Sequence, residues 1–394
     1  MITDKRNAGL DVARGLAVLG TFATNVWVFT HPDGLPGTLF APVTDGLGSA
    51  LAQALPLGKS LALLSLLFGI GLELQRRSAL RRGLPWNRTH RVRALVLFAE
   101  AGVHFLLVAE FDVLMGYAVA ALLAGPVLVR PDRTRRRLVA VLLTTHVLAL
   151  GALVVVLSRA ATVPGGPLVT PYATGSFWEL VVFRVENLAV FRTEPVGLLL
   201  LSTASFLLGA GLVRRGILEA ARGRVLRRRL VVAGAAGVVL EAVFLVAGGP
   251  FGILLTRYAS AVLIALGVLA VVLEVQGRRP QGPGWAGRRS AEVGRAALSC
   301  YVLQNLLASA LCYGWGLGLA TRFGPEHRSV VTASVFTVVA AAVVVFAHVL
   351  ARTGRRGPLE AFSARAQRAV TPRSPERRSR AATPGAAART STRR

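Results

Sequence analysis

Residues 130–157 read RPDRTRRRLVAVLLTTHVLALGALVVVL, and this stretch decides the class of fold. A cluster of arginines ends at Arg137, and no aspartate, glutamate, lysine or arginine follows between Leu138 and Leu157. A helix of roughly 20 apolar residues is long enough to cross the hydrocarbon core of a bilayer. Arginine clusters of this kind flank the cytoplasmic ends of such helices. The stretch therefore predicts a membrane-spanning helix that enters the bilayer from the cytoplasm.

Composition extends this prediction to the whole chain. Of its 394 residues, 53% are hydrophobic and 16% are charged, and the mean hydropathy is positive. A soluble chain of this length has no interior large enough for so much apolar surface, so the expected solvent is lipid. Apolar runs of spanning length predict ten helices, at residues 10–30, 52–75, 92–109, 113–130, 138–157, 196–214, 230–247, 251–275, 296–316 and 329–350. The predicted fold is an all-α, polytopic membrane helix bundle.

The net charge of +27 comes from arginine clusters in the connections, which is a signal of topology and argues against a nucleic-acid partner. Clusters follow the second, fourth, sixth, eighth and tenth runs. The connections after the odd-numbered runs hold few basic residues: Arg159, Arg184, Arg192, Arg322 and Arg328. The positive-inside rule then places both termini in the cytoplasm.

The sequence divides into three parts. Residues 1–357 form the predicted helix bundle, and residues 358–370 form a short amphipathic helix at the inner membrane surface. Residues 371–394 are basic, almost without apolar side chains, and we expect them to be disordered. The long outer connection, residues 158–195, contains an amphipathic stretch around Trp178 that is expected to lie along the outer membrane face.

Polar residues at membrane depth are the candidate functional residues, because they are costly in lipid and usually face the bundle interior. Asp11 and Arg14 share one face of the first helix, either as an interfacial ion pair that seats the helix or as part of a binding site. Asn25 and His31 follow toward the outer end of the same helix. His31 is equally expected to belong to a polar site that faces outward or to be a loop histidine in solvent.

The third predicted helix carries the best local constellation. Glu100 and His104 lie one turn apart and can exchange a proton, with the carboxylate holding the imidazole in one tautomer. A hydrogen-bonded pair that only locks two helices together is the structural alternative. Glu110 and Asp112 follow at the outer mouth, where their negative charge calls for a neighbouring cation.

Lys59 and Arg257 are the cations that the predicted topology places toward the same outer side, although either can also extend to the interface. Glu241 and Gln304 add polar side chains in the seventh and ninth helices. We expect one site in the outer half of the bundle, formed by Asn25, His104, Glu241 and Arg257. Because neither Cys300 nor Cys312 has a partner at metal-binding spacing, no metal site is predicted.

Motifs at several points resemble the YeiB-like family of bacterial inner-membrane proteins, whose C-terminal half is the domain of unknown function 418. The motifs are Leu10-Asp11-Val12-Ala13-Arg14-Gly15, Ser65-Leu66-Leu67-Phe68-Gly69-Ile70-Gly71, His104 with Phe111-Asp112-Val113-Leu114 and Tyr117, Gly294-Arg295-Ala296-Ala297-Leu298-Ser299-Cys300-Tyr301-Val302-Leu303-Gln304-Asn305, and Gly357-Pro358-Leu359-Glu360. The resemblance covers nearly the whole chain and implies a polytopic fold without an established activity.

The first helix is also distantly similar to transmembrane acyltransferases in which an Arg-Gly motif is followed by an asparagine and then a catalytic histidine. Arg14-Gly15, Asn25 and His31 occur in that order here, with His31 closer to Asn25 than in those enzymes. This similarity implies that a cytoplasmic thioester donor, with acyl-CoA as the substrate, passes an acyl group to an acceptor at the outer face. The acceptor is a hydroxyl or amine of a small molecule or a glycan, and no bound cofactor is needed.

In this hypothesis His31 or His104 is the base or transient acyl carrier. Asn25 orients this histidine, Glu100 tunes it, and Arg257 holds an anionic group. One alternative is a proton-coupled transporter in which Glu100, His104 and Glu241 relay protons. The other is a membrane scaffold without turnover. In each case the lipid bilayer of the bacterial inner membrane is the expected partner, and the sequence leaves the oligomeric state open.

Overall fold

The computed structural model describes residues 7–40, 47–159, 170–279 and 281–370, and within them the chain forms helices and connections but no β-strand. The first helices are α1 (Ala8–Phe29), α2 (Gly34–Phe40), α3 (Leu47–Ala54), α4 (Lys59–Arg81), α5 (Trp86–Leu107), α6 (Leu114–Val127), α7 (Asp132–Arg159), α8 (Phe177–Glu186), α9 (Leu188–Gly197) and α10 (Leu199–Arg214). The later ones are α11 (Gly223–Ala247), η1 (Gly249–Phe251), α12 (Gly252–Leu255), the π-helix η2 (Thr256–Ser260), α13 (Ala261–Gly277), α14 (Trp285–Arg295), α15 (Ala297–Cys312), α16 (Leu319–Arg322), η3 (Pro325–His327), α17 (Arg328–Arg352) and α18 (Pro358–Val370). The predicted all-α bundle is confirmed, and the basic tail lies outside the described residues.

The predicted number of ten spans is not confirmed. Among the described residues, six helical stretches are long and apolar enough to cross a membrane, and a bent pair, α9 with α10, raises this number to seven. The six are Ala8–Phe29, Leu51–Arg81, Asp132–Arg159, Gly223–Ala247, Gly252–Gly277 and Pro325–Arg352. Each remaining predicted run also forms a helix, but α6 has 14 residues and α15 has 16, which is short for a span.

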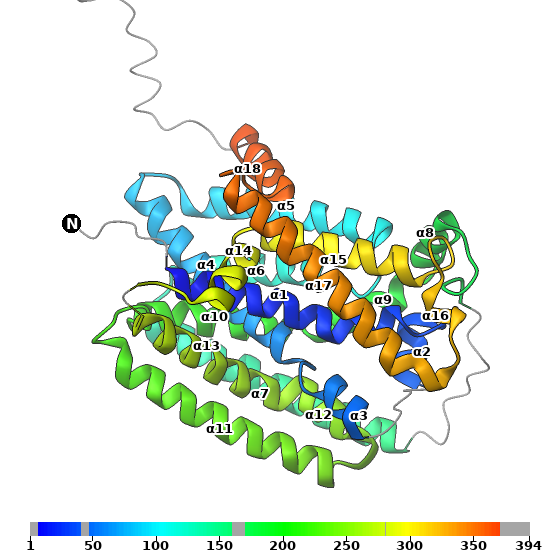
Figure 1. Ribbon diagram of the computed structural model, residues 1–394. Helices are drawn as coiled ribbons and strands as arrows, with labels where there is room; N and C mark the ends of the chain where they lie inside the picture. The colour runs from blue at the N-terminus through cyan, green and yellow to red at the C-terminus, as the bar shows by residue number, and fades with distance from the viewer. Residues whose placement is uncertain (1–6, 41–46, 160–169, 280, 371–394) are drawn as a thin grey trace, which may run out of the picture.

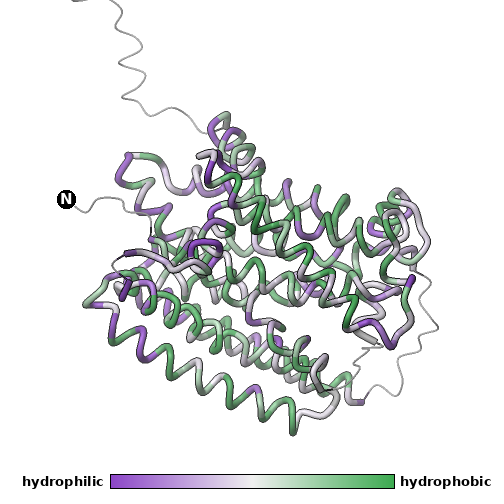
Figure 2. The backbone as a smooth tube through the Cα atoms, viewed as in Figure 1, coloured by the Kyte–Doolittle hydropathy of each residue, from purple (hydrophilic) through white to green (hydrophobic). Residues whose placement is uncertain are grey.

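The long helices lie side by side, so that the bundle has two ends (Figure 1). The beginning of α1 and the C-terminal helix α18 lie toward the same end, which is drawn at the upper left in Figure 1. Hydrophilic backbone segments gather mainly at that end in Figure 2. We call it the basic end, because the arginine-rich connections that follow α4, α6, α10 and α13 lie there. The fold thus gathers clusters that are scattered in the sequence, as the charge alternation predicts.

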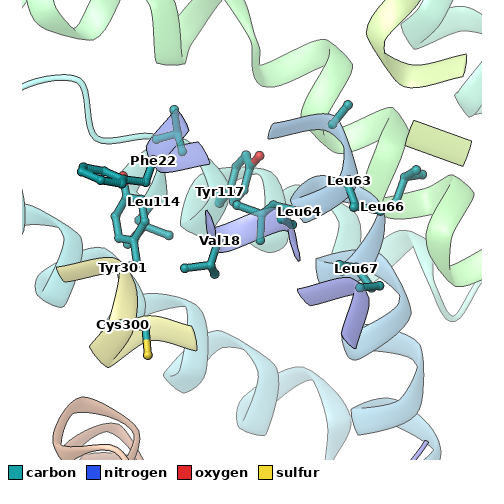
Figure 3. Close-up of a cluster of buried hydrophobic side chains, with 14 of the residues drawn as sticks. Val18, Phe22, Leu63, Leu64, Leu66, Leu67, Leu114, Tyr117, Cys300 and Tyr301 are labelled. Carbon is teal, nitrogen blue, oxygen red and sulfur yellow. The ribbon is translucent and has the colours of Figure 1, made fainter. Parts of the chain in front are cut away.

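Close contacts between glycines and backbone hold α1 in the middle of the bundle. A Cβ atom on Gly15 would lie 1.8 Å from the Ser290 carbonyl oxygen of α14, and one on Gly294 would lie 1.9 Å from the Asp11 carbonyl oxygen. Figure 3 shows Val18 and Phe22 of α1 in the core beside Leu64 and Leu67 of α4 and Tyr301 of α15. The motif glycines therefore serve helix packing, since only a residue without a side chain permits this approach.

Helices α7 and α11 form the outside of the bundle. In the most apolar segment of each of these two helices, only 11% is buried inside the protein. Valine and leucine side chains such as Val147, Leu148 and Val232 are more than half exposed. An apolar surface of this extent is stable only against lipid or another apolar partner. This observation identifies the chain as a membrane protein more directly than the core does.

Replacing Gly234 by alanine is expected to destabilise the protein by about 1–3 kcal/mol, the usual cost of overpacking. The reason is that a Cβ atom on Gly234 of α11 would lie 2.6 Å from the Gly267 Cα atom of α13. The measurement is the thermal unfolding midpoint in detergent. Gly151→Ala on α7 is the control, because a Cβ atom there meets nothing within 4 Å. Equal midpoints for the two variants would show that α11 and α13 do not pack through these glycines.

Candidate functional site

A group of polar side chains is buried in the bundle around His104. The exposed fraction is 3% for His104 and 0% for both Asp112 and Asn305. The His104 Nδ1 atom lies 3.4 Å from Asp112 Oδ1, and its Nε2 atom lies 3.3 Å from the Asn305 amide nitrogen. Tyr301 donates a 3.4 Å hydrogen bond to Asp112 and places its ring 5.1 Å from the imidazole. The approach of Asp112 to Nδ1 is an ion-pair contact without hydrogen-bond geometry. A histidine that lies between a carboxylate and an amide can act as an oriented general base.

The local backbone explains why Asp112 reaches His104. Helix α5 ends at Leu107, one turn after His104, and the connection to α6 turns back inside the protein instead of passing through solvent. Asp112 Oδ1 accepts a hydrogen bond of 3.2 Å from the Leu114 backbone nitrogen, which holds the carboxylate at the start of α6. A carboxylate from the connection therefore stands beside a histidine of the preceding helix. Irregular backbone at membrane depth is tolerated only where protein covers it.

Two arginines of α8 and α9 cover this connection. Arg184, 1% exposed, forms an ion pair of 3.1 Å with Glu110 and donates to the Leu106 and Val108 carbonyl oxygens. Arg192 donates to the Glu110 and Asp112 carbonyl oxygens. These bonds satisfy backbone acceptors that have no partner inside a helix. Tyr172 lies in the connection that precedes α8. Its burial, followed by the nearby Glu110 carboxylate, raises the pKa of its phenol well above the ordinary value.

A cavity of about 470 Å³ leads from the basic end toward the His104 group. Its walls are mostly apolar, with side chains of α1, α4, α5, α6 and α15, and three arginines line it: Arg14, Arg93 and Arg295. Arg295 is exposed, so the cavity reaches the surface there, whereas Leu114 and Tyr301 in its lining are buried. Tyr301 touches both the cavity and the His104 group. The cavity therefore ends at the Tyr301 side chain, which separates it from His104.

Helix α18 closes one wall of the cavity through Glu360 and Ser363. The Glu360 carboxylate accepts from the backbone nitrogens of Leu298 at 2.8 Å and Ser299 at 3.2 Å, and from the Ser299 hydroxyl at 2.5 Å. It thereby caps the N-terminus of α15, where free backbone N–H groups and the helix dipole favour a negative charge. The last two motifs along the chain, Gly294–Asn305 and Gly357–Glu360, meet at this cap.

Replacing Glu360 by alanine is expected to lower the free energy of unfolding by about 1–2 kcal/mol, the upper range for the loss of a helix cap. The loss leaves the first turn of α15 without its acceptor and detaches α18 from it. Thermal unfolding in detergent measures the effect. Glu326→Ala is the matched control, because that carboxylate is exposed on the surface. A midpoint equal to that of the control would rule out the capping role.

The structure brings together some of the predicted site residues. Arg14 and Asp11 form the expected pair at 3.1 Å, and Arg14 also donates to the Gly294 carbonyl oxygen and lines the cavity. Glu100 also lines the cavity, but its carboxylate accepts from Ser363 of α18 and not from His104. The partners of His104 are Asp112 and Asn305, so the prediction that Glu100 tunes it is wrong.

The predicted single outer site is not formed. Lys59 pairs with Glu241 at 2.6 Å, and Arg257 pairs with Glu194. Neither cation is therefore the ion-pair partner of Glu110 or Asp112. His31 is 5% exposed and accepts from the Asp33 backbone nitrogen, and neither it nor the half-buried Asn25 lines the cavity. The side chain of Gln304, the residue directly before Asn305, donates to the Val18 carbonyl oxygen. The sequence-based grouping failed because depth in the membrane does not specify which helices are neighbours.

Sequence reasoning missed the roles of Arg184, Arg192, Asn305 and Tyr301. A signal for the arginines existed, since they are among the few basic residues in an outer connection. Asn305 and Tyr301 lie on one face of α15, four residues apart, in the motif that also contains Gln304. Only the packing of α15 against α1 and of the connection after α5 shows that they point at His104.

The fold and the buried polar site define a polytopic helical membrane protein with a cavity inside the bundle. Residues 212–367 match the family described as "Protein of unknown function (DUF418)". The chain is 24% identical to the uncharacterized protein YxaH of Bacillus subtilis, over 91% of this chain and 93% of the relative. It is 28% identical to the uncharacterized protein YeiB of Escherichia coli, over 90% and 94% of the two chains. These matches confirm the predicted resemblance to the YeiB-like proteins.

Proposed function

We propose that the protein is an acyltransferase of the bacterial inner membrane that moves an acyl group from a cytoplasmic thioester, such as acyl-CoA, to a hydroxyl or amine acceptor. One observation carries this proposal. His104, with Asp112 beside one ring nitrogen and Asn305 beside the other, lies behind Tyr301 at the inner end of a mostly apolar cavity whose lining includes three arginines. A histidine oriented by a carboxylate is the group that acyl transfer needs to activate its acceptor.

The cavity suits an amphiphilic anionic donor. Arg14, Arg93 and Arg295 offer guanidinium groups to the phosphates of a carrier such as coenzyme A. The apolar walls accept an acyl chain, and the volume of about 470 Å³ is within the usual range for a small-molecule site. The topology predicted from the charge alternation places the basic end in the cytoplasm, where thioester donors are found.

In the proposed reaction, His104 Nε2 takes the proton from the acceptor as the acceptor oxygen or nitrogen attacks the thioester carbonyl carbon. The carbon–sulfur bond then breaks, and the thiolate leaves and receives the proton from His104. The products are the acylated acceptor and the free thiol. Asp112, 3.4 Å from Nδ1, favours the tautomer with its proton on Nδ1, so that Nε2 can take the proton once the acceptor displaces the Asn305 amide. The same carboxylate stabilises the imidazolium between the two proton transfers.

The proposal is tested with the full chain in liposomes, supplied with acyl-CoA on the side of the basic end and with an extract of envelope lipids and glycans as acceptors. Consumption of the thioester with formation of an acylated product supports it. If no thioester is consumed with any acceptor while an imposed proton gradient is dissipated, the protein is a transporter and the proposal is wrong.

Filling the cavity is expected to weaken donor use without unfolding the protein. In Gly71→Phe, a large side chain enters the cavity from α4, because a Cβ atom on this cavity-lining glycine meets nothing within 4 Å. We expect the KM for acyl-CoA to rise by about tenfold or more, since several apolar contacts of the acyl chain are lost. Gly211→Phe on α10 is the control, as that glycine is equally open but lies outside the cavity lining. An unchanged KM in Gly71→Phe would exclude the cavity as the donor site.

A further inference from the structure

A cluster of arginines at the basic end of α4, α7 and α10 is separate from the cavity and has no part in the proposed reaction. At its centre is Glu73, whose side chain is fully buried. Arg76 and Arg77 of the same helix reach Glu73 at 2.9 and 3.0 Å, and Arg214 of α10 reaches it at 2.9 Å. A second carboxylate, Asp132 at the start of α7, pairs with Arg135 and lies 3.7 Å from Arg214.

The cluster has more positive than negative charge. Four guanidinium groups, those of Arg76, Arg77, Arg135 and Arg214, stand against the two carboxylates of Glu73 and Asp132, which leaves two positive charges. Asp132 is 68% exposed, so solvent screens much of its charge. The cluster therefore attracts an anion.

Within the part of the chain that the structure describes, several N–H groups of the cluster have no acceptor. Arg135 is only 7% exposed, yet its Nε and Nη1 atoms are buried without a hydrogen-bond partner among the described residues, and so is the Nε atom of Arg214. Buried guanidinium nitrogens normally find acceptors, because leaving them unpaired costs free energy. Phosphate oxygens match the forked geometry of guanidinium groups well. The missing acceptor is thus expected to be a phosphate group.

The position of the cluster indicates where this phosphate comes from. Arg135 lies in the first turns of α7, the helix whose apolar surface is the most exposed together with that of α11. A molecule whose phosphate binds Arg135 and Arg214 can lay its apolar chains along the exposed face of α7, where Val141 and Leu148 are more than half exposed. Basic pockets between membrane helices at the cytoplasmic side bind anionic headgroups in this way.

We propose that Arg135 and Arg214, at the junction of α7 and α10, bind the phosphate of an anionic phospholipid of the inner leaflet. The bound headgroup supplies the oxygen acceptors that Arg135 and Arg214 lack, and it joins α7 to the α4–α10 pair. The site is a lipid-binding site and does not depend on any catalytic activity of the protein.

The test uses the full chain in mild detergent and measures the thermal midpoint while phosphatidylglycerol, phosphatidylcholine or inorganic phosphate is titrated. We expect phosphatidylglycerol to raise the midpoint saturably, with little effect of phosphatidylcholine. We expect Arg135→Gln to bind phosphatidylglycerol with an affinity lower by about tenfold, as measured from the titration of its thermal midpoint, since charge-assisted hydrogen bonds are lost. Arg136→Gln is the matched control, because Arg136 is an exposed neighbour on the same helix and should leave the affinity unchanged.

Asp132→Asn provides a second variant that keeps every arginine. Removing this exposed carboxylate takes away a competing anion and is expected to tighten phosphatidylglycerol binding. Equal affinities of wild type, Arg135→Gln and Asp132→Asn would overturn the proposal, as would an equal response to phosphatidylcholine. Stabilisation by inorganic phosphate to the same extent at the same concentration would identify a soluble phosphate as the ligand and exclude the lipid.

Discussion

His104→Ala is expected to lower the rate of acyl transfer by about 10²- to 10⁴-fold, the usual contribution of a general base. The Nε2 atom of the imidazole faces the Asn305 amide, which an acceptor can displace. Asp112 lies beside the Nδ1 atom. Asp112→Asn should reduce the rate as well, because an amide no longer stabilises the imidazolium. The rate is measured as acyl-CoA consumed per mole of protein in liposomes.

His327→Ala serves as the control for this prediction, since His327 is an exposed histidine before α17 and its loss should leave the rate unchanged. Folding of each variant is checked by its thermal midpoint. If His31→Ala abolished transfer while His104→Ala did not, the base would be His31 and the distant likeness to transmembrane acyltransferases would point to the correct residue. A rate that is unchanged in both variants would contradict histidine catalysis altogether.

Arg184→Ala is expected to have the largest effect on stability, a loss of about 3–5 kcal/mol, because it leaves a buried charge without its partner. Glu110 is 0% exposed, and Arg184 also supplies donors to the Leu106 and Val108 carbonyl oxygens. The connection that carries Asp112 should loosen with it, so transfer activity falls in parallel. Thermal unfolding in detergent measures the change.

The double variant Arg184→Met with Glu110→Leu distinguishes a buried ion pair from a simple packing contact. Replacing both charges by apolar side chains should recover much of the lost stability, since a buried pair is costly to break but not to exchange. Arg322→Ala, an exposed arginine at the end of α16, is the control and should be neutral. A double variant as unstable as Arg184→Ala would contradict the ion-pair explanation.

How far the sequence predicts the site is clear from Glu100 and His104. Their spacing of four residues indicates a shared helix face, and both do face the interior. A shared face is still too wide to decide contacts, because side chains one turn apart can turn to different neighbours. Glu100 turns to Ser363 of α18, and His104 turns to Asp112 and to Asn305, which is 201 residues away in the sequence.

The sequence alone determined the helical class, the membrane as solvent, the resemblance to the YeiB-like proteins and the gathering of the arginine clusters at one end. These properties depend on hydropathy and charge, which act on each segment separately. Only the tertiary structure decided which polar groups meet: Glu110 with Arg184, Lys59 with Glu241, and His104 with Asp112 and Asn305. Such pairings depend on which helices are neighbours and how each is rotated. That is settled by close packing, as where Gly15 meets Ser290 and Gly234 meets Gly267, and not by the apolar content of any one helix.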